Sequence, residues 1–232
     1  MAEDPYAQRD RRILDAAADL VLRWGAKRVT IDEVARHAGI GKGTVYLHFE
    51  SRARLLDAML MRESVAITDE LIAAIERDPV AVLPGEQARL TYLIVHRRPL
   101  SRAMMTRDRD LLGELAHEQA VRPLAESSRT FGHEFFALLR DHGLLRADQE
   151  PGTQELIFGA IQTGFYLNPA AAELAPEATA NALRDTIAAT LQPPEPPDPT
   201  RLESAASQAV ARYRRLRDDL ADEIARRPER SR

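Results

Sequence analysis

The stretch of residues 30–49 reads TIDEVARHAGIGKGTVYLHF, and it decides the fold. Thr30 is followed three residues later by Glu33, which is the spacing of a capping box and predicts that a helix begins here. This short helix is predicted over residues 32–38. Gly39 then predicts its end, because glycine accepts the positive φ of a tight turn without a steric cost.

A second short helix is predicted over residues 43–49, directly after the turn. Ala35 is small where two helices must approach, Gly39 provides the turn, and Val45 packs the second helix back onto the first. A small residue, a glycine and an aliphatic residue at these offsets are what a helix-turn-helix requires. The alternative is a helical hairpin inside a core.

The second helix carries side chains suited to a DNA duplex. Lys42 can donate to guanine or to a phosphate, and Thr44 offers a methyl group and a hydroxyl. The Tyr46 hydroxyl can reach a phosphate oxygen, and Gly43 lets the backbone come close. We therefore predict a nucleic-acid interface on this helix.

Two further candidates are His48, on the outer face of this helix, and Arg52, which follows it in the sequence. Arg52 stands near the start of the next predicted helix, where a phosphate would be favourable. For His48 two alternatives stay open, since its imidazole can contact phosphate or simply lie on the surface.

The rest of the chain is also predicted to be helical. Apolar residues recur at helical spacing from Asp10 to Trp24, and a fourth helix is expected from Ser51 to about Arg62. No segment alternates with a period of two between turn residues, so no sheet is expected. The fold class is all-α.

Taken together, these residues resemble the TetR family of bacterial transcriptional regulators. The matching segments are 13–17, Gly25, 30–35, 38–49 and 51–56. The resemblance implies that Thr30, Lys42, Thr44, Tyr46, His48 and Arg52 face DNA. Gly43 is added to these DNA-binding candidates because it lets the backbone come close. Gly41 stands where the family often has serine, so a side-chain cap is missing. Arg52–Ala53 stands where the family often has Lys-Glu, and Arg52 keeps the charge for a phosphate contact.

Four segments follow from these patterns. Residues 1–62 are expected to form a three-helix helix-turn-helix DNA-binding domain, and 63–192 a larger helical ligand-binding and dimerisation domain. Residues 193–199 are rich in proline and read as a linker. Residues 200–232 form an additional helix with a heptad-like apolar seam, which either folds back on its own chain or pairs with a second one.

For the larger domain the resemblance is one of layout. It implies that the last two core helices, over 153–167 and 177–191, form a four-helix bundle with a second chain. The residues expected at this dimer interface are Leu156, Ala160, Gly164, Leu183, Ile187 and Leu191.

A small-molecule pocket is also expected in the larger domain. Flexible and aromatic side chains suit an adaptable apolar cavity, although each of them can equally be plain core. The candidates are Met104, Met105, Phe131, Phe135, Phe165 and Tyr166.

Composition limits the other possibilities. The chain has no cysteine, which excludes disulfides and Cys-ligated zinc. Its longest apolar runs are too short to cross a bilayer, and its acidic N-terminus is unlike a secretory signal. We expect a cytoplasmic protein with no membrane partner, no cofactor and no metal. Residues 1–62 have a small excess of basic side chains, whereas 63–192 are acidic.

The sequence therefore predicts a regulator and no enzyme. The expected mechanism is a homodimeric repressor that binds double-stranded DNA at a palindromic operator and is released by a small molecule of unknown identity. One alternative is a regulator without an effector, whose larger domain only dimerises or binds another protein. A remote alternative is an all-α carboxylate metalloenzyme that uses Glu114 and His117.

Overall fold

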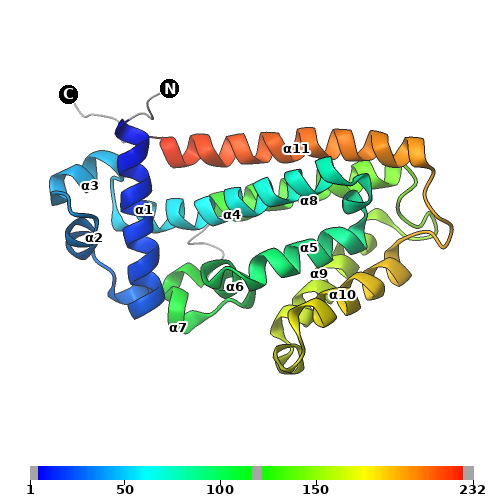
Figure 1. Ribbon diagram of the computed structural model, residues 1–232, viewed down its shortest axis with the longest axis horizontal. Coiled ribbons are helices and arrows are strands. Elements are labelled where there is room, and N and C mark those ends of the chain that lie inside the picture. Colours follow the sequence, from blue (N-terminus) through cyan, green and yellow to red (C-terminus); the bar gives the residue numbers. More distant parts are fainter. Residues whose placement is uncertain (1–4, 117–121, 227–232) are drawn as a thin grey trace. The chain divides into compact units, whose positions relative to one another are not determined.

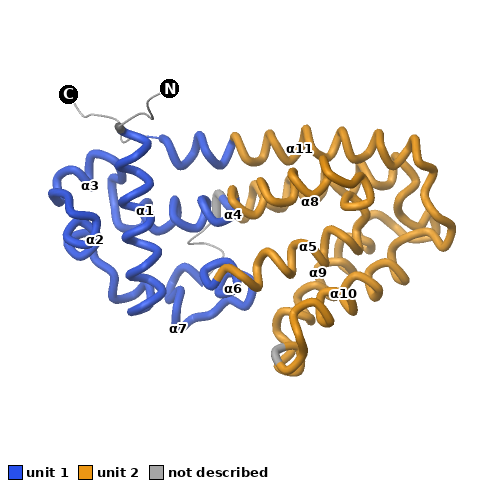
Figure 2. Tube along the Cα trace, viewed as in Figure 1, with its two compact units in different colours: residues 1–64, 99–124, 219–232 blue, residues 65–98, 125–218 orange. Residues whose placement is uncertain are grey.

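The structure is a computed structural model that describes residues 5–116 and 122–226 (Figure 1). All regular elements in these two ranges are helices, as predicted. The chain divides into two compact units, which Figure 2 shows in different colours.

The first unit combines residues 1–64 with 99–124 and 219–232. Its core is formed by the inward faces of the first four α-helices, where Ile13, Val34, Val45 and Met59 are fully buried. These are apolar positions of the predicted helical stripes. Its elements are α1 (Pro5–Trp24), η1 (Ala26–Arg28), α2 (Ile31–Ala38), α3 (Lys42–His48), the first half of α4 (Arg52–Arg77), α6 (Pro99–Thr106), α7 (Arg109–Leu112), η3 (Gly113–Ala116) and the end of α11 (Pro199–Ala225).

The second unit combines residues 65–98 with 125–218. It is built around one apolar cluster of buried residues from all its long helices except α9 (Pro151–Leu167), which packs against this cluster through partly buried side chains. Its elements are the second half of α4, η2 (Pro79–Val82), α5 (Pro84–His96), most of α8 (Arg122–Asp141), α9, η4 (Pro169–Glu173), α10 (Pro176–Leu191) and most of α11.

The domain boundaries differ from those expected. The helix predicted to stop near Arg62 continues to Arg77, because no glycine or proline occurs in it before Pro79. Residues 99–124 were expected in the larger domain, yet they belong to the first unit. There Leu112 is buried, and α7 packs on α1.

The additional C-terminal helix packs on its own chain. It begins at Pro199, where the Asp198 carboxylate accepts a hydrogen bond from the backbone N–H of Arg201 at 2.9 Å. Leu202, Ala209 and Tyr213 lie in the apolar cluster of the second unit. The Tyr213 hydroxyl donates to Gln87 Oε1 at 2.7 Å, and burial raises the pKa of Tyr213. The seam is therefore used within the chain, which resolves the choice that its pattern left open.

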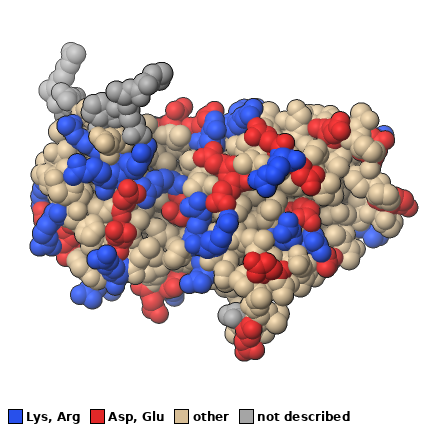
Figure 3. All heavy atoms as spheres, viewed as in Figure 1, with Lys and Arg blue, Asp and Glu red and all other residues tan. Residues whose placement is uncertain are grey.

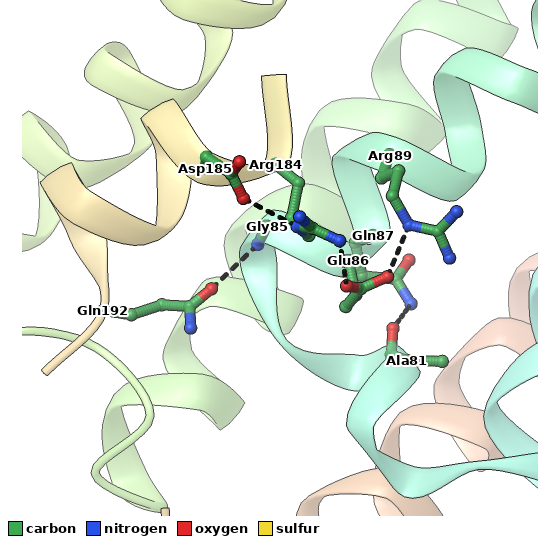
Figure 4. Close-up of polar contacts among 8 residues, drawn as sticks. All are labelled: Ala81, Gly85, Glu86, Gln87, Arg89, Arg184, Asp185 and Gln192. Carbon is green, nitrogen blue, oxygen red and sulfur yellow. Dashed lines mark hydrogen bonds and ion pairs between the residues drawn. The ribbon is translucent and has the colours of Figure 1, made fainter. Parts of the chain in front are cut away.

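In the second unit, α10 packs closely along α5 (Figure 4). The backbone N–H of Gly85 donates to Gln192 Oε1 at 3.0 Å, and Glu86 lies between Arg89 and Arg184. A Cβ atom added at Gly85 would lie only 2.8 Å from the backbone oxygen of Arg184. The seam between these helices thus requires a residue without a side chain at position 85.

Replacing Gly85 by alanine is expected to destabilise the fold by about 1–3 kcal/mol, since two helix backbones must separate to admit the methyl group. The matched control is Gly132→Ala on α8, where an added Cβ would meet nothing within 4 Å. That control should be neutral or gain about 0.5–1 kcal/mol, because alanine favours a helix. Urea unfolding at one protein concentration compares the two. Equal stability of both variants would contradict the close approach.

Candidate nucleic-acid interface

The start of α2 is fixed by the predicted capping box. The backbone N–H of Glu33 donates to Thr30 Oγ1 at 3.3 Å, and the backbone N–H of Thr30 donates to Glu33 Oε2 at 3.1 Å. Thr30 itself is exposed. It caps the helix and still presents its side chain to solvent, so it remains a candidate for contact with DNA.

The turn between α2 and α3 is built around Gly39. This residue has φ 65° and ψ 40°, in the left-handed region that favours glycine. The Ile40 N–H donates to the Ala35 oxygen at 3.0 Å, and Arg12 of α1 donates to the Ala38 oxygen. Gly41 begins α3 without a side-chain cap, as its sequence predicted. These contacts hold the two short helices at a fixed angle.

The inner side of α3 is buried and its outer side is open. Val45 is fully buried and the following Phe49 is 1% exposed. Lys42, Gly43 and Tyr46 are exposed, and Thr44 is half-buried. A Cβ atom at Gly43 would meet nothing within 4 Å, so the surface there is bare.

Lys42 keeps its charge at the start of α3. Its Nζ donates to Asp32 Oδ2 at 2.9 Å, and this hydrogen bond raises the pKa of Lys42. Both side chains are exposed. The ammonium group is therefore positively charged at neutral pH and accessible to an anion.

The structure corrects the prediction for His48. Its side chain is 1% exposed, and its Nδ1 lies 2.5 Å from Asp10 Oδ1. The ring of Tyr6 lies against it, with ring centroids 4.8 Å apart. Because His48 is enclosed by α1, it braces the end of α3 and presents no group to a duplex.

The structure also corrects the prediction for Arg52. Its Nε donates to the Val29 oxygen at 2.5 Å, and its Nη2 donates to the Ala26 oxygen. The guanidinium therefore binds two carbonyl groups at η1, where the prediction placed a phosphate. Arg52 ties the start of α4 to the segment that precedes α2.

The surface around α3 contains an exposed side chain that was not predicted from the sequence. Leu47 is 54% exposed at the outer side of this helix. It was not among the predicted DNA contacts because its side chain has no hydrogen-bonding group. Basic side chains gather over α1, α2 and α3 on the face drawn in Figure 3. The exposed ones in these elements and η1 are Arg9, Arg11, Arg12, Arg23, Lys27, Arg28, Arg36 and Lys42.

The six candidate pocket residues are not brought together within either unit. Met104 and Met105 belong to α6 of the first unit, and Met105 is 38% exposed. The four aromatic residues belong to the second unit, where Phe135 lies in the apolar core and Phe131, Phe165 and Tyr166 are partly buried against it. Centroid distances are 5.8 Å for Phe131–Phe135, 4.4 Å for Phe131–Tyr213 and 5.3 Å for Tyr92–Tyr166. Of the six, Phe165 lines an apolar hollow of about 400 Å³ between α9, η4 and α10.

The residues predicted at the dimer interface are exposed on α9 and buried on α10. Leu156, Ala160 and Gly164 of α9 are exposed, and Leu156 is 71% accessible. Ala160 and Gly164 also line the 400 Å³ hollow. The three residues of α10 were assigned wrongly, because that side of the helix faces the core of its own chain, where Leu183, Ile187 and Leu191 are each 0% exposed.

The metalloenzyme alternative gains no support. Glu114 lies in η3, whereas His117 lies outside the described residues. Among the residues that the structure describes, no three His, Asp or Glu side chains group closely enough to hold a metal ion. Nor does any described helix combine the length and apolar character needed to cross a membrane.

Comparisons with known proteins agree with this geometry. Residues 13–59 match the family model of bacterial regulatory proteins, tetR family. Over 50 residues the chain is 40% identical to the HTH-type transcriptional regulator SrpR of Pseudomonas putida, covering 22% of the chain and 24% of that relative. Over 121 residues it is 30% identical to the uncharacterised HTH-type regulator YdeS of Bacillus subtilis, covering 52% and 54%. These matches thus span about a quarter and a half of the relatives' lengths.

Solved structures share the fold over about four fifths of the chain. NalD of Pseudomonas aeruginosa, the secondary repressor of the MexAB-OprM multidrug efflux pump, superposes with a TM-score of 0.60 at 20% identity and covers 82% of this chain and 100% of its own. FadR of Bacillus subtilis, solved in complex with stearoyl-CoA, gives 0.55 at 14% identity over 76% and 96%. Residues 13–59 thus carry the helix-turn-helix domain of the tetR family of bacterial regulatory proteins, on a fold that these solved structures share.

Proposed function

We propose that the protein is a transcriptional regulator that binds double-stranded DNA through the outer face of α3. The observation that carries this proposal is the arrangement of that helix. Its inner residues are buried, its start is held across the Gly39 turn, and Lys42 and Tyr46 are exposed on its outer side. In a helix-turn-helix the second helix lies in the major groove while the first braces on the backbone. Such a regulator acts in the cytoplasm, where bacterial DNA lies.

We further propose that two copies bind a palindromic operator. The outer side of α9 exposes Leu156 and Leu167, and Leu174 is exposed at the end of η4. Small residues, Ala160 and Gly164, line the hollow beside them and allow a second helix to come close. A second copy of α9 and α10 would cover this apolar surface. The two recognition helices would then enter successive major grooves about 34–36 Å apart.

A small-molecule effector completes the proposal. The relative solved with stearoyl-CoA and the efflux-pump repressor NalD support a ligand-responsive repressor by analogy. In the second unit the buried Tyr166 hydroxyl has no hydrogen-bond partner among the described residues, which favours a polar group of a ligand or a water beside it. The effector would release DNA only by binding one conformation better than the other. A rise in melting temperature on ligand addition separates this proposal from the effector-free alternative.

The variants Lys42→Ala and Tyr46→Phe test the DNA interface. Each is expected to weaken operator binding by about tenfold or more, because every dimer loses two contacts. Both side chains are exposed, so the melting temperature should stay unchanged. Gel shift at fixed salt measures the affinity, on a DNA fragment identified by footprinting near the protein's own gene. The matched control is Arg102→Ala, an exposed cation on α6 outside the helix-turn-helix. Unchanged binding by both α3 variants would refute the interface.

A further inference from the structure

The outer face of α3 contains an apolar side chain that the proposed function has not used. Leu47 is 54% exposed, and it is the most exposed large apolar residue in the described part of the first unit. Its position is penultimate in the helix. The neighbouring Val45, His48 and Phe49 are buried, so Leu47 points away from the core of its own unit.

Leu47 shares its face with Gly43 and Thr44. Residues three and four positions apart are neighbours on a helix surface. Gly43 adds no side chain, and its surroundings are open. Of the three residues, only Thr44 can form a side-chain hydrogen bond, and it also carries a methyl group. The strip made by Gly43, Thr44 and Leu47, here called the apolar strip, is therefore bare, shallow and mostly non-polar.

The chemistry of the apolar strip limits what it can recognise in the major groove. Guanine is commonly read by arginine or lysine, and adenine by asparagine or glutamine. None of these residues stands on the strip. The thymine 5-methyl group is the apolar feature of the base edges in that groove. The exposed cations of α1, α2 and α3 match the charge of a duplex. The strip lies on the same short helix as the proposed phosphate contacts at Lys42 and Tyr46.

We propose that Leu47 is a specificity-determining residue that packs against the 5-methyl group of a thymine in each half-site of the operator. This inference rests on the proposed function. Leu47 selects an A·T pair at one position by contact with a methyl group, while Thr44 borders the same contact. Sequence preference at this position comes from shape and apolar contact, with no bidentate hydrogen bond.

Substitution of thymine by uracil tests the inference, because uracil lacks only the 5-methyl group. Full-length protein first selects its operator from a random duplex library. Each thymine in the half-sites is then replaced in turn by uracil, and affinity is measured by fluorescence anisotropy. One position per half-site is expected to lose about fourfold in affinity, the equivalent of one buried methyl group.

Protein variants assign that loss to Leu47. In Leu47→Ala the affinity for the thymine operator falls, and uracil at the same position causes no further loss. Leu47→Met retains an apolar contact and should retain the uracil penalty. Leu22→Ala removes another exposed leucine of the same unit, on α1, and should behave as wild type. Circular dichroism melts verify that each variant is folded.

The possible outcomes separate the two claims. If the wild-type protein binds its operator but no uracil substitution lowers affinity, the inference is overturned and the proposed function stands. If the uracil penalty persists at full size in Leu47→Ala, another residue reads the methyl group and the inference is again overturned. If the wild-type protein selects no duplex sequence, both claims fail.

Discussion

Replacing Leu156 by arginine is expected to leave the chain folded, to convert the dimer to a monomer and to abolish measurable operator binding. Leu156 is 71% exposed on α9, so the longer side chain displaces nothing in its own chain. In the proposed dimer this position is covered by a second copy. An arginine there would place two unpaired charges in an apolar interface, which is strongly unfavourable.

The effect on DNA binding should far exceed the loss of a single contact. Two linked recognition helices gain about 10²–10⁴ in affinity over one, because the second half-site is bound intramolecularly. Light scattering gives the mass of the variant, and gel shift gives its affinity. Val80→Arg is the matched control, since Val80 is 41% exposed in η2 of the same unit. A dimeric Leu156→Arg variant with normal DNA binding would rule out α9 as the interface.

Replacing Arg52 by alanine is expected to lower the free energy of unfolding by about 2–4 kcal/mol. Arg52 donates to the carbonyl oxygens of Val29 and Ala26, and hydrogen bonds from charged donors contribute about 1.5–3 kcal/mol each. Removing the guanidinium takes a donor from both carbonyls, and the Ala26 oxygen keeps only the backbone N–H of Val29. The structure thus predicts that Arg52→Ala is less stable than the wild-type protein and makes the same number of phosphate contacts with DNA.

Lys42→Ala provides the opposite pattern and serves as the comparison. A phosphate contact contributes about 0.9 to the slope of log affinity against log salt concentration for B-DNA. Lys42→Ala should make the affinity depend less steeply on salt and leave the midpoint of urea unfolding unchanged. Arg52→Ala should lower the midpoint of urea unfolding and leave the salt dependence unchanged. If Arg52→Ala instead weakened the salt dependence and kept its stability, Arg52 would be a phosphate ligand after all.

The helix-turn-helix was predictable because its determinants are local. Thr30 and Glu33 are three residues apart, and the turn depends on the left-handed conformation of Gly39 alone. His48 and Arg52 were assigned wrongly because their partners are distant in sequence. Asp10 lies 38 residues before His48, and Val29 lies 23 residues before Arg52. Spacing along the chain carries no information about such contacts.

In the second unit, the helical spacing of apolar residues predicted which face of a helix is buried but not which neighbour buries it. Leu183 and Ile187 repeat with helical spacing, a pattern that serves equally for contact with α5 or with a second chain. The structure places both in the core. Phe131 and Phe135 presented the same ambiguity between core and pocket. Phe135 lies in the core, and Phe131 is partly buried against it beside Tyr213. Tertiary packing decided these cases.

Site-specific crosslinking tests most directly whether the outer face of α3 lies on DNA. Because the chain contains no cysteine, Tyr46→Cys carries a single thiol for a photoreactive probe. Binding of the labelled protein to its operator is verified before irradiation. We expect crosslinks at two positions of the operator, about one helical turn apart. The same probe at Arg102→Cys on α6 should give none. DNA that is bound yet crosslinks from position 102 and not from position 46 would contradict the account.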